Sequence, residues 1–211
     1  MSDDIELLRK WRDGDASAGQ VLFRRHTDTL RRFFHNKAAT AVEDLVQETM
    51  LACLQSHNQY QQRSSFRTYL LGVARHQLFD FYRRSRTDAT RLEFTTVSVH
   101  DLAPSPSLQA AKAGEERVLL EALRRLPIDI QIALELSYWE DLTGPELAEI
   151  LEVPVDTAYS RLRRARQLLK EQLQLLATSG EQLAATQTNL ARWANALRHP
   201  IDPDGEPPNS D

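Results

Sequence analysis

Four residues whose side chains could read DNA bases occur close together in the C-terminal half of the chain. They are Tyr159, Ser160, Arg163 and Arg164. At helical spacing they fall on one side of a helix, together with Gln167. Arginine and hydroxyl side chains form hydrogen bonds with base edges in the major groove of DNA. This face therefore predicts DNA binding.

The helix that carries this face must bury its opposite side. The expected buried side recurs every three or four residues and consists of Ala158, Leu162, Ala165, Leu169 and Leu173. Asp156 or Thr157 is expected to cap the first turn of this helix.

The exposed side of this helix is purely cationic. From Thr157 to Lys170 the chain has five basic residues and no acid. Acids are concentrated just before it, at Glu135, Glu140, Asp141, Glu146, Glu149 and Glu152. An arginine-rich helix is most often a solvated surface, but this separation of charge favours DNA contact.

A shorter helix precedes the cationic one. Its apolar side comprises Leu142, Leu147, Ile150 and Leu151. Thr143 and Glu146 have the spacing of a capping box, and Pro145 falls in the first turn, where a missing N–H is harmless. Pro154 then forces a turn. Two helices joined in this way are typical of a helix-turn-helix, with an ordinary helical hairpin as the alternative.

Hydrophobic periodicity divides the chain into two helical blocks. It is strong over residues 1–86, fades over 87–114, which hold prolines and serines typical of a flexible linker, and returns over 115–176. Residues 177–211 are expected to be part helical and then disordered. We therefore expect an all-α protein with two small helical domains joined by a flexible linker, the second a four-helix domain with a helix-turn-helix.

The composition excludes several classes of protein. The 211 residues carry a formal net charge of −4 and a single cysteine, Cys53, which rules out an intrachain disulfide. No apolar run approaches the length of a membrane helix, and the acidic N-terminus lacks the apolar core of a signal peptide. We expect a cytoplasmic protein.

Catalysis has little support in the sequence. His26, His35, His57 and His76 do not show the spacing of a metal site such as HExxH, and there is no glycine-rich phosphate loop. We expect neither enzyme activity nor a metal or cofactor.

The first block begins with two helices separated at Gly14 and Asp15. The second of them carries four arginines that are expected to form a solvated surface: Arg24, Arg25, Arg31 and Arg32.

Two stripes run along the next expected helix, which begins near Val42. The stripe expected to be buried comprises Val42, Leu45, Val46, Thr49, Met50, Cys53 and Leu54. The other stripe comprises Asp44, Gln47, Glu48, Leu51 and Gln55. Acids around an exposed leucine fit a docking face for a basic partner helix, although the pattern alone slightly favours an ordinary solvated face.

A further helix, expected over 66–84 and capped by Ser64 or Ser65, has apolar residues on more than one side and must be central in its domain. Arginines and tyrosines lie along it and in the polar loop before it. They are Tyr60, Arg67, Tyr69, Arg83 and Arg84. Aromatic side chains beside arginines suit single-stranded nucleic acid, because bases stack on the rings while arginine meets phosphate.

Three blocks of the chain, in this order, resemble the extracytoplasmic-function (group IV) type of bacterial sigma factors, which belong to the sigma-70 family. The blocks are DLVQETML at 44–51, FRTYLLGVARHQLFDFYRR at 66–84, and the segment 123–169. They are similar to conserved regions two and four, with a linker in place of a third domain. The resemblance implies a subunit that gives RNA polymerase its promoter specificity.

The resemblance also implies roles for individual residues. Asp44, Gln47 and Glu48 match positions that bind the clamp helices of the largest polymerase subunit. The loop 57–65 and the start of the following helix match the part that captures an extruded base of the minus-ten element, for which Tyr60, Arg67 and Tyr69 are candidates. Arg83 and Arg84 are expected to bind DNA as well.

In the second domain, Tyr159, Ser160, Arg163 and Arg164 match positions that read the minus-thirty-five element. Arg161 and Arg166 are expected to meet phosphates, which fix register without specifying sequence. The chain departs from the family pattern at three positions, with Tyr69 for a usual Trp, His76 for a usual Asn and Asp156 for a usual Gly.

The partners implied by the resemblance are core RNA polymerase, promoter DNA and an anti-sigma protein that masks these faces, without membrane insertion. A stand-alone helix-turn-helix regulator is the alternative, and it would bind duplex DNA tightly without polymerase. An enzyme is a third reading.

Overall fold

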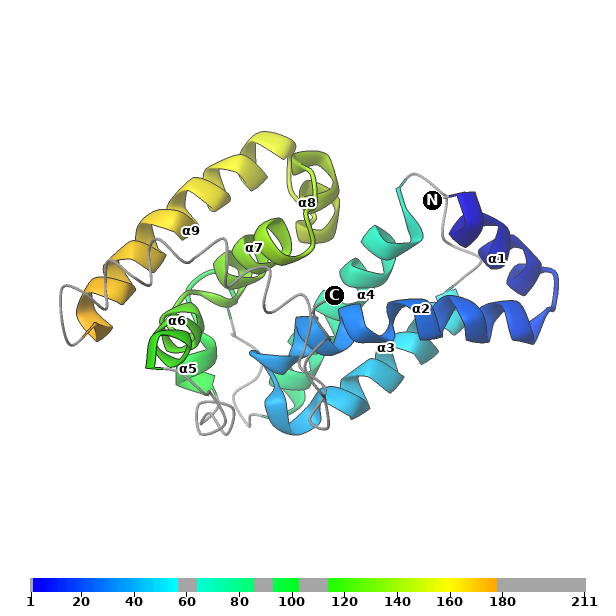
Figure 1. Cartoon of the computed structure of the whole chain (residues 1–211), viewed down its shortest axis with the longest axis horizontal. Coiled ribbons are helices and arrows are strands. Elements are labelled where there is room, and N and C mark those ends of the chain that lie inside the picture. The colour runs from blue at the N-terminus through cyan, green and yellow to red at the C-terminus, as the bar shows by residue number, and fades with distance from the viewer. Residues whose placement is uncertain (1, 57–63, 86–92, 103–113, 178–211) are drawn as a thin grey trace, which may run out of the picture.

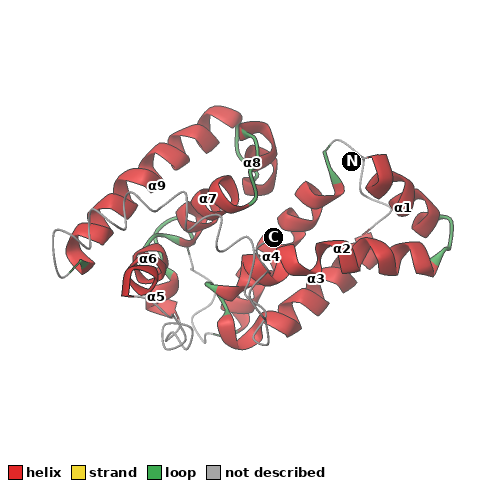
Figure 2. Cartoon of the chain, in the orientation of Figure 1, coloured by secondary structure: helices red, strands yellow, loops and turns green. Residues whose placement is uncertain are grey.

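A computed structural model of the chain describes residues 2–56, 64–85, 93–102 and 114–177. Over these ranges the secondary structure is helical and contains no β-strand (Figure 2). The helices, in chain order, are α1 Ser2–Arg12, α2 Ala16–His35, the short 3-10 helix η1 Ala39–Ala41, α3 Val42–Ser56, α4 Phe66–Arg84, α5 Val99–Leu102, α6 Gly114–Arg124, α7 Ile128–Trp139, α8 Gly144–Leu151 and α9 Val155–Leu176. The predicted all-α class is confirmed.

The helices form two groups that lie side by side (Figure 1). The first helical group consists of α1–α4 and the second of α5–α9. Helix α4 lies between them and packs directly against α8. The predicted class of two helical domains is confirmed, and the domain boundaries at 86 and 115 stay predictions. The C-terminal extension beyond Ala177 lies outside the described residues.

Side chains cap two helices of the first group, and one of these caps is the predicted Ser65. The Asp15 carboxylate accepts hydrogen bonds from the backbone N–H groups of Ser17 at 2.9 Å and Ala18 at 3.2 Å, so it caps α2. Ser65 accepts from the N–H of Thr68 and caps α4. Gly14 takes the positive φ of 101° needed for the turn between α1 and α2. Local chemistry therefore sets these helix ends.

Apolar residues of both groups share one continuous core. This core includes Leu70 and Leu78 of α4 together with Leu147 and Leu151 of α8. A second cluster joins α6, α7 and the C-terminal half of α9 through residues such as Leu169. Because the first cluster crosses the boundary between the groups, burial of apolar surface helps to hold them together.

Residues 93–102 are more ordered than a flexible linker would be. The Phe94 ring stacks on Phe79 of α4, with centroids 4.0 Å apart and planes 3° apart. Val99 is fully buried, and the N–H of Ile128 donates to the Val97 carbonyl at 3.0 Å. Periodicity did not reveal this packing, because isolated apolar residues in a short segment form no pattern.

The helix-turn-helix has the predicted capping box at its start. The Thr143 hydroxyl accepts from the N–H of Glu146, whose carboxylate accepts from the N–H of Thr143 at 2.9 Å. The Thr143 hydroxyl and the Thr143 N–H both donate to this carboxylate and lower the pKa of Glu146. After α8, Glu152 adopts a left-handed conformation with φ of 55° and ends the helix.

The predicted buried side of α9 is confirmed at every position, but its predicted cap is wrong. All five residues from Ala158 to Leu173 on that side are buried. Helix α9 begins at Val155, so Asp156 and Thr157 already lie inside its first turn. Pro154 occupies the capping position without a side-chain hydrogen bond, since its fixed φ leads directly into the helix.

We predict that Thr143→Ala lowers the free energy of unfolding by about 1 kcal/mol, because it removes the acceptor for the first turn of α8. Urea denaturation followed by circular dichroism measures this loss. Thr95→Ala, at an exposed threonine between helices, should leave the midpoint unchanged. Equal losses in the two variants would contradict the capping role.

His26 of α2 is a buried titratable group. Its Nε2 atom lies 3.0 Å from Asp4 Oδ2, and its ring lies 5.5 Å from that of Phe66. Burial lowers the pKa of His26 from its ordinary value of 6.5. The Asp4 carboxylate raises the pKa of His26, whereas the positive charges of Arg67 and Arg25 lower it further.

We predict that the protein loses stability as the pH falls below about 6.5. The pKa of His26 is lower in the folded than in the unfolded chain, so the unfolded chain takes up the proton first on acidification. The contribution of His26 to stability is complete above the pKa that it has in the unfolded chain. It declines as the pH falls towards the lower pKa that His26 has in the folded chain. Urea unfolding at several pH values should show a shallower decline for His26→Gln, and the wild-type slope for His35→Gln, which alters an exposed histidine of the same helix.

Candidate nucleic-acid and polymerase interfaces

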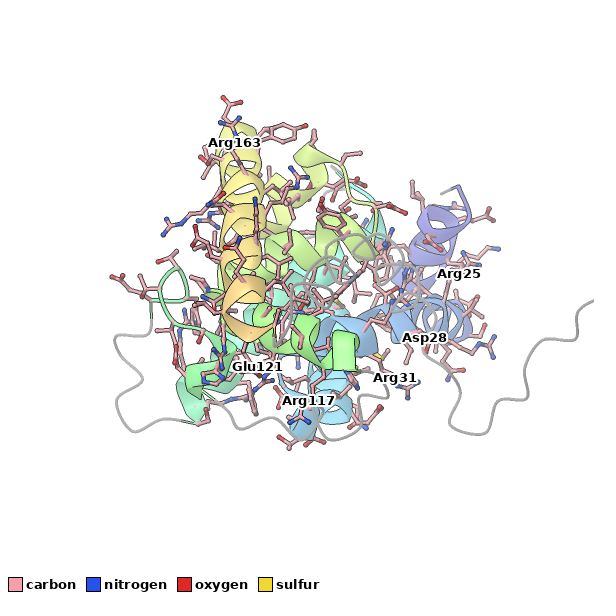
Figure 3. The ribbon with its side chains drawn as sticks, turned by 60° about the vertical axis from the view of Figure 1, so that its left-hand side comes forward. Arg25, Asp28, Arg31, Arg117, Glu121 and Arg163 are labelled. Atoms are coloured by element: carbon pink, nitrogen blue, oxygen red, sulfur yellow. The ribbon has the colours of Figure 1, made fainter. Side chains whose placement is uncertain are left out.

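The outer face of α9 presents the predicted base-reading side chains to solvent. Tyr159, Ser160, Arg163 and Arg164 are all exposed, and Tyr159 has 54% of its surface accessible. Figure 3 shows Arg163 at the periphery of the molecule. An exposed cationic helix face next to a capped short helix has the layout needed to enter a major groove.

The Tyr159 ring is positioned by Gly144 at the start of α8. A Cβ atom added to Gly144 would lie 2.8 Å from Tyr159 Cε1 and closer still to Cζ and Oη. Only glycine leaves room for the ring in this position. Gly144 therefore sets where the phenol of Tyr159 stands on the outer face.

The two arginines predicted to meet phosphates are both held by side chains of α7. Arg161 Nη1 donates to Asp129 Oδ2 at 3.2 Å, and its side chain is only 20% exposed. Arg166 is exposed, donates from Nε to the Tyr138 hydroxyl at 3.3 Å and lies 5.8 Å from the centroid of that ring. Arg161 is thus the less accessible of the two.

The acidic stripe of α3 lies on the surface. Asp44 and Gln47 are exposed, while Glu48 pairs with Arg84 of α4 at 2.7 Å. Leu51 is 54% exposed, as predicted; Leu54 was predicted to be buried and is 44% exposed. Two leucines beside acids make this face less polar than the sequence pattern suggested.

The base-capture residues have different surroundings. Tyr69 is half-buried, its hydroxyl lies 2.6 Å from Ser56 Oγ, and burial raises its pKa. Arg83 pairs with Asp80 at 2.9 Å and lies 5.4 Å from the Phe94 centroid. Tyr60 lies outside the described residues. Arg67 and Tyr69 thus both lie in the first turns of α4 but face different neighbours, Glu140 and Ser56 of α3, while Arg83 and Arg84 lie at the other end of the helix.

Arg67 is engaged by an acid from the second helical group. Its guanidinium donates to the Glu140 carboxylate and, at 2.7 Å, to the Glu140 carbonyl oxygen. Arg32 of α2 pairs with the same carboxylate at 3.0 Å. Glu140 is 6% exposed and Arg32 only 18%, so the prediction of a solvated Arg32 is wrong. A buried carboxylate requires paired cations, which explains why Arg32 and Arg67 both turn towards Glu140.

An ion pair between Lys37 and Glu135 lies fully inside the boundary between the two groups. Lys37 Nζ also donates to the Phe33 carbonyl. Glu135 Oε1 accepts from Asn36 at 3.2 Å and from Gln131 at 2.7 Å. Such additional hydrogen bonds are what a buried ion pair requires.

Asp129 of α7 connects α4 and α9. Its Oδ1 accepts from Arg75 of α4 at 3.0 Å, and its Oδ2 accepts from Arg161 of α9 at 3.2 Å. Further along α4, His76 Nε2 lies 3.0 Å from Glu152 Oε1. Four of the six acids that precede the cationic helix in sequence therefore contact the first helical group: Glu135, Glu140, Glu149 and Glu152.

Comparison with known proteins gives two matching families. Residues 22–87 match Sigma-70 region 2, and residues 116–169 match Sigma-70, region 4. The ECF RNA polymerase sigma factor SigX of Bacillus subtilis is 30% identical over 152 residues, which cover 67% of this chain and 78% of SigX. The chain belongs to the ECF sigma factors. It is a promoter-recognition subunit, and the predicted family is confirmed.

Other sigma factors match over more of the chain. The ECF RNA polymerase sigma-E factor of Haemophilus influenzae is 26% identical over 183 residues, which cover 82% of this chain and 96% of that protein. The sigma factor RpoE of Bartonella quintana, solved in complex with the anti-sigma factor NepR, has a TM-score of 0.56 at 22% identity, covering 74% of this chain and 96% of RpoE. The latter likeness shows a shared fold.

Sequence reasoning missed the interdomain residues of this sigma factor. Arg32, Lys37, Arg75 and Asp129 received no role at the boundary between the groups. One signal was present, because α7 is apolar on all sides yet contains Asp129, Gln131 and Glu135. A helix that is apolar all round is buried, so its acids must have buried partners.

The described ranges were also compared with the requirements of a metal site and of a membrane-spanning helix. There, no group of three or more His, Cys, Asp or Glu side chains could hold a metal ion. None of the helices in those ranges is long and apolar enough to cross a membrane.

We predict that Gly144→Ala moves the Tyr159 ring and changes its NMR resonances. The free energy of unfolding should change by less than about 1 kcal/mol, because the ring is exposed and can rotate away while alanine favours the helix. Gly72→Ala on α4 is the matched control, since nothing lies within 4 Å of its added Cβ. Unaltered Tyr159 resonances in Gly144→Ala would contradict the positioning role.

Proposed function

We propose that the first helical group docks on core RNA polymerase through the α3 face formed by Asp44, Gln47 and Glu48. The exposed Leu51 and Leu54 support this assignment, because an apolar centre rimmed by acids suits a basic, amphipathic partner helix. Glu48 must exchange Arg84 for a polymerase side chain, a small change for an exposed pair.

We propose that α9 reads the minus-thirty-five element with Tyr159, Ser160, Arg163 and Arg164. The observation that carries this proposal is that these four side chains share one exposed face of α9, within the match to region 4. Arg166 is proposed to contact a phosphate. Arg161 could do so only after exchanging Asp129 for the phosphate.

The minus-ten element is assigned to the start of α4 and the preceding loop. In this proposal Tyr60 and Tyr69 offer stacking surfaces to unpaired bases and Arg67 offers a cation to the backbone. Arg83 and Arg84 extend the positive charge along the exposed end of α4. The residues match region 2, where the family recognises this element.

The sigma factor is proposed to act in the cytoplasm. Its proposed role is to bind polymerase and promoter DNA, without catalysing a reaction. An anti-sigma protein is proposed as a further partner, as RpoE of Bartonella quintana was solved with NepR. Family membership disfavours a stand-alone regulator. That alternative would bind promoter duplex tightly without polymerase, which a mobility-shift assay with and without core enzyme distinguishes.

We predict that Arg164→Ala relaxes selectivity for the minus-thirty-five element in run-off transcription. The assay uses core RNA polymerase and a library of randomised promoters, with sequencing of the transcribed templates. Loss of a base contact should reduce discrimination at one or two positions by about 1–3 kcal/mol.

Arg117→Ala is the matched control, because Arg117 is an exposed arginine on α6 of the same helical group (Figure 3). It should leave promoter selectivity as in the wild type. Equal relaxation in both variants would indicate a general effect of charge. No promoter-specific transcripts from wild type, together with polymerase-independent duplex binding, would favour the stand-alone regulator.

A further inference from the structure

The first turn of α9 carries an acid on the face proposed to read DNA. Asp156 lies three residues before Tyr159 and four before Ser160, and residues at this spacing are neighbours on one side of a helix. The Asp156 side chain is exposed. Among the described residues, none forms a hydrogen bond or an ion pair with its carboxylate. The carboxylate is therefore available to a ligand that approaches the outer face of α9.

The neighbouring hydroxyl of Ser160 also presents an acceptor. It donates its proton to the Thr157 carbonyl at 2.8 Å, within α9 itself. Its oxygen keeps lone pairs that can accept a hydrogen bond from outside the protein. The first turns of α9 therefore present two acceptors, which we call the acceptor pair: the Asp156 carboxylate and Ser160 Oγ. Farther along the same face, Arg163 and Arg164 present only donors.

The position of Asp156 suits a contact with a base. In a helix-turn-helix, the N-terminal residues of the second helix contact base edges in the major groove. Eight residues separate Asp156 from Arg164, which corresponds to about 12 Å along the helix axis. The two side chains therefore reach different base pairs, and the contribution of each to selectivity can be measured separately.

The chemistry of the acceptor pair selects among the groups that DNA offers. A phosphate has no hydrogen to donate, and its charge repels the carboxylate. Guanine presents only the acceptors N7 and O6 in the major groove, and thymine presents O4 and a methyl group. Adenine presents an amino group beside the acceptor N7, whereas cytosine presents the N4 amino group, from which carboxylates accept. Cytosine is therefore the base that fits the acceptor pair best.

We propose that Asp156 is a specificity-determining residue of α9, which accepts a hydrogen bond from the N4 amino group of a cytosine in the minus-thirty-five element. The inference rests on the proposed function of α9 as the reader of that element. Ser160 supports the selection, because guanine finds no donor at the acceptor pair. The negative charge of Asp156 also repels phosphates, so it lowers the affinity for DNA of any sequence while it raises selectivity.

The test compares wild type with Asp156→Asn and Asp156→Ala in run-off transcription with core RNA polymerase and the library of randomised promoters. Wild type should prefer cytosine by about tenfold at one position of the minus-thirty-five element. Asp156→Ala should lose this preference. Asp156→Asn should shift it towards adenine, because an asparagine amide both donates and accepts and pairs with N7 and N6 of adenine.

Asp28→Asn is the matched control. It removes the same charge by the same substitution from an exposed acid of α2, which lies away from Arg163 (Figure 3). This variant should keep the base preferences of wild type. Urea unfolding of each variant separates a role in stability from a role in reading, because an acid in the first turn of a helix also interacts favourably with the helix dipole.

The outcomes distinguish this inference from the function on which it rests. Asp156 variants that keep every base preference of wild type, while Arg164→Ala relaxes selectivity at its own position, would overturn this inference alone. The same holds for Asp156 variants that change transcription equally from all templates, or for an Asp156-dependent preference for a base other than cytosine. A wild type without any preference in the minus-thirty-five element would overturn the proposed function of α9, and this inference with it.

Discussion

Lys37 and Glu135 are taken out of water together where the turn after α2 meets α7. Dehydrating two ions is offset only by close contact and by hydrogen bonds to their remaining atoms. Asn36, Gln131 and the Phe33 carbonyl supply these bonds. Separating the pair without water entering would cost several kcal/mol per ion. This cost favours one relative position of the two helical groups. The contacts of Arg32 and Arg75 lie in the same boundary.

The Tyr82 hydroxyl and Arg124 attach the turn that carries Lys37 to both helical groups. Tyr82 of α4 donates to the Lys37 carbonyl, and Arg124 of α6 donates to the Asn36 carbonyl at 3.1 Å. Burial raises the pKa of Tyr82 to about 12, so its proton stays in place as a donor. The turn after α2 is thereby held by α4 on one side and by α6 on the other.

The helix-turn-helix could be predicted from sequence because its determinants lie within a few residues of one another. The buried side of α9 from Ala158 to Leu173 and the Thr143–Glu146 box follow from helical spacing alone. The partners of Lys37 and Arg32 could not be predicted, since they lie 98 and 108 residues away in sequence. The stacking of Phe94 could not be predicted for a similar reason, because its partner Phe79 belongs to another segment.

Asp129 gives α4 and α9, the two helices proposed to bind DNA, a carboxylate in common, with one oxygen for Arg75 and the other for Arg161. Sigma factors of this family look modular, with one part for each promoter element. In this protein the two helical groups carry separate proposed recognition surfaces, but the charges where they meet are matched to each other. A chimera that joins this first helical group to the second group of a relative would keep both proposed DNA-reading surfaces, yet it would have unmatched charges where the two groups meet.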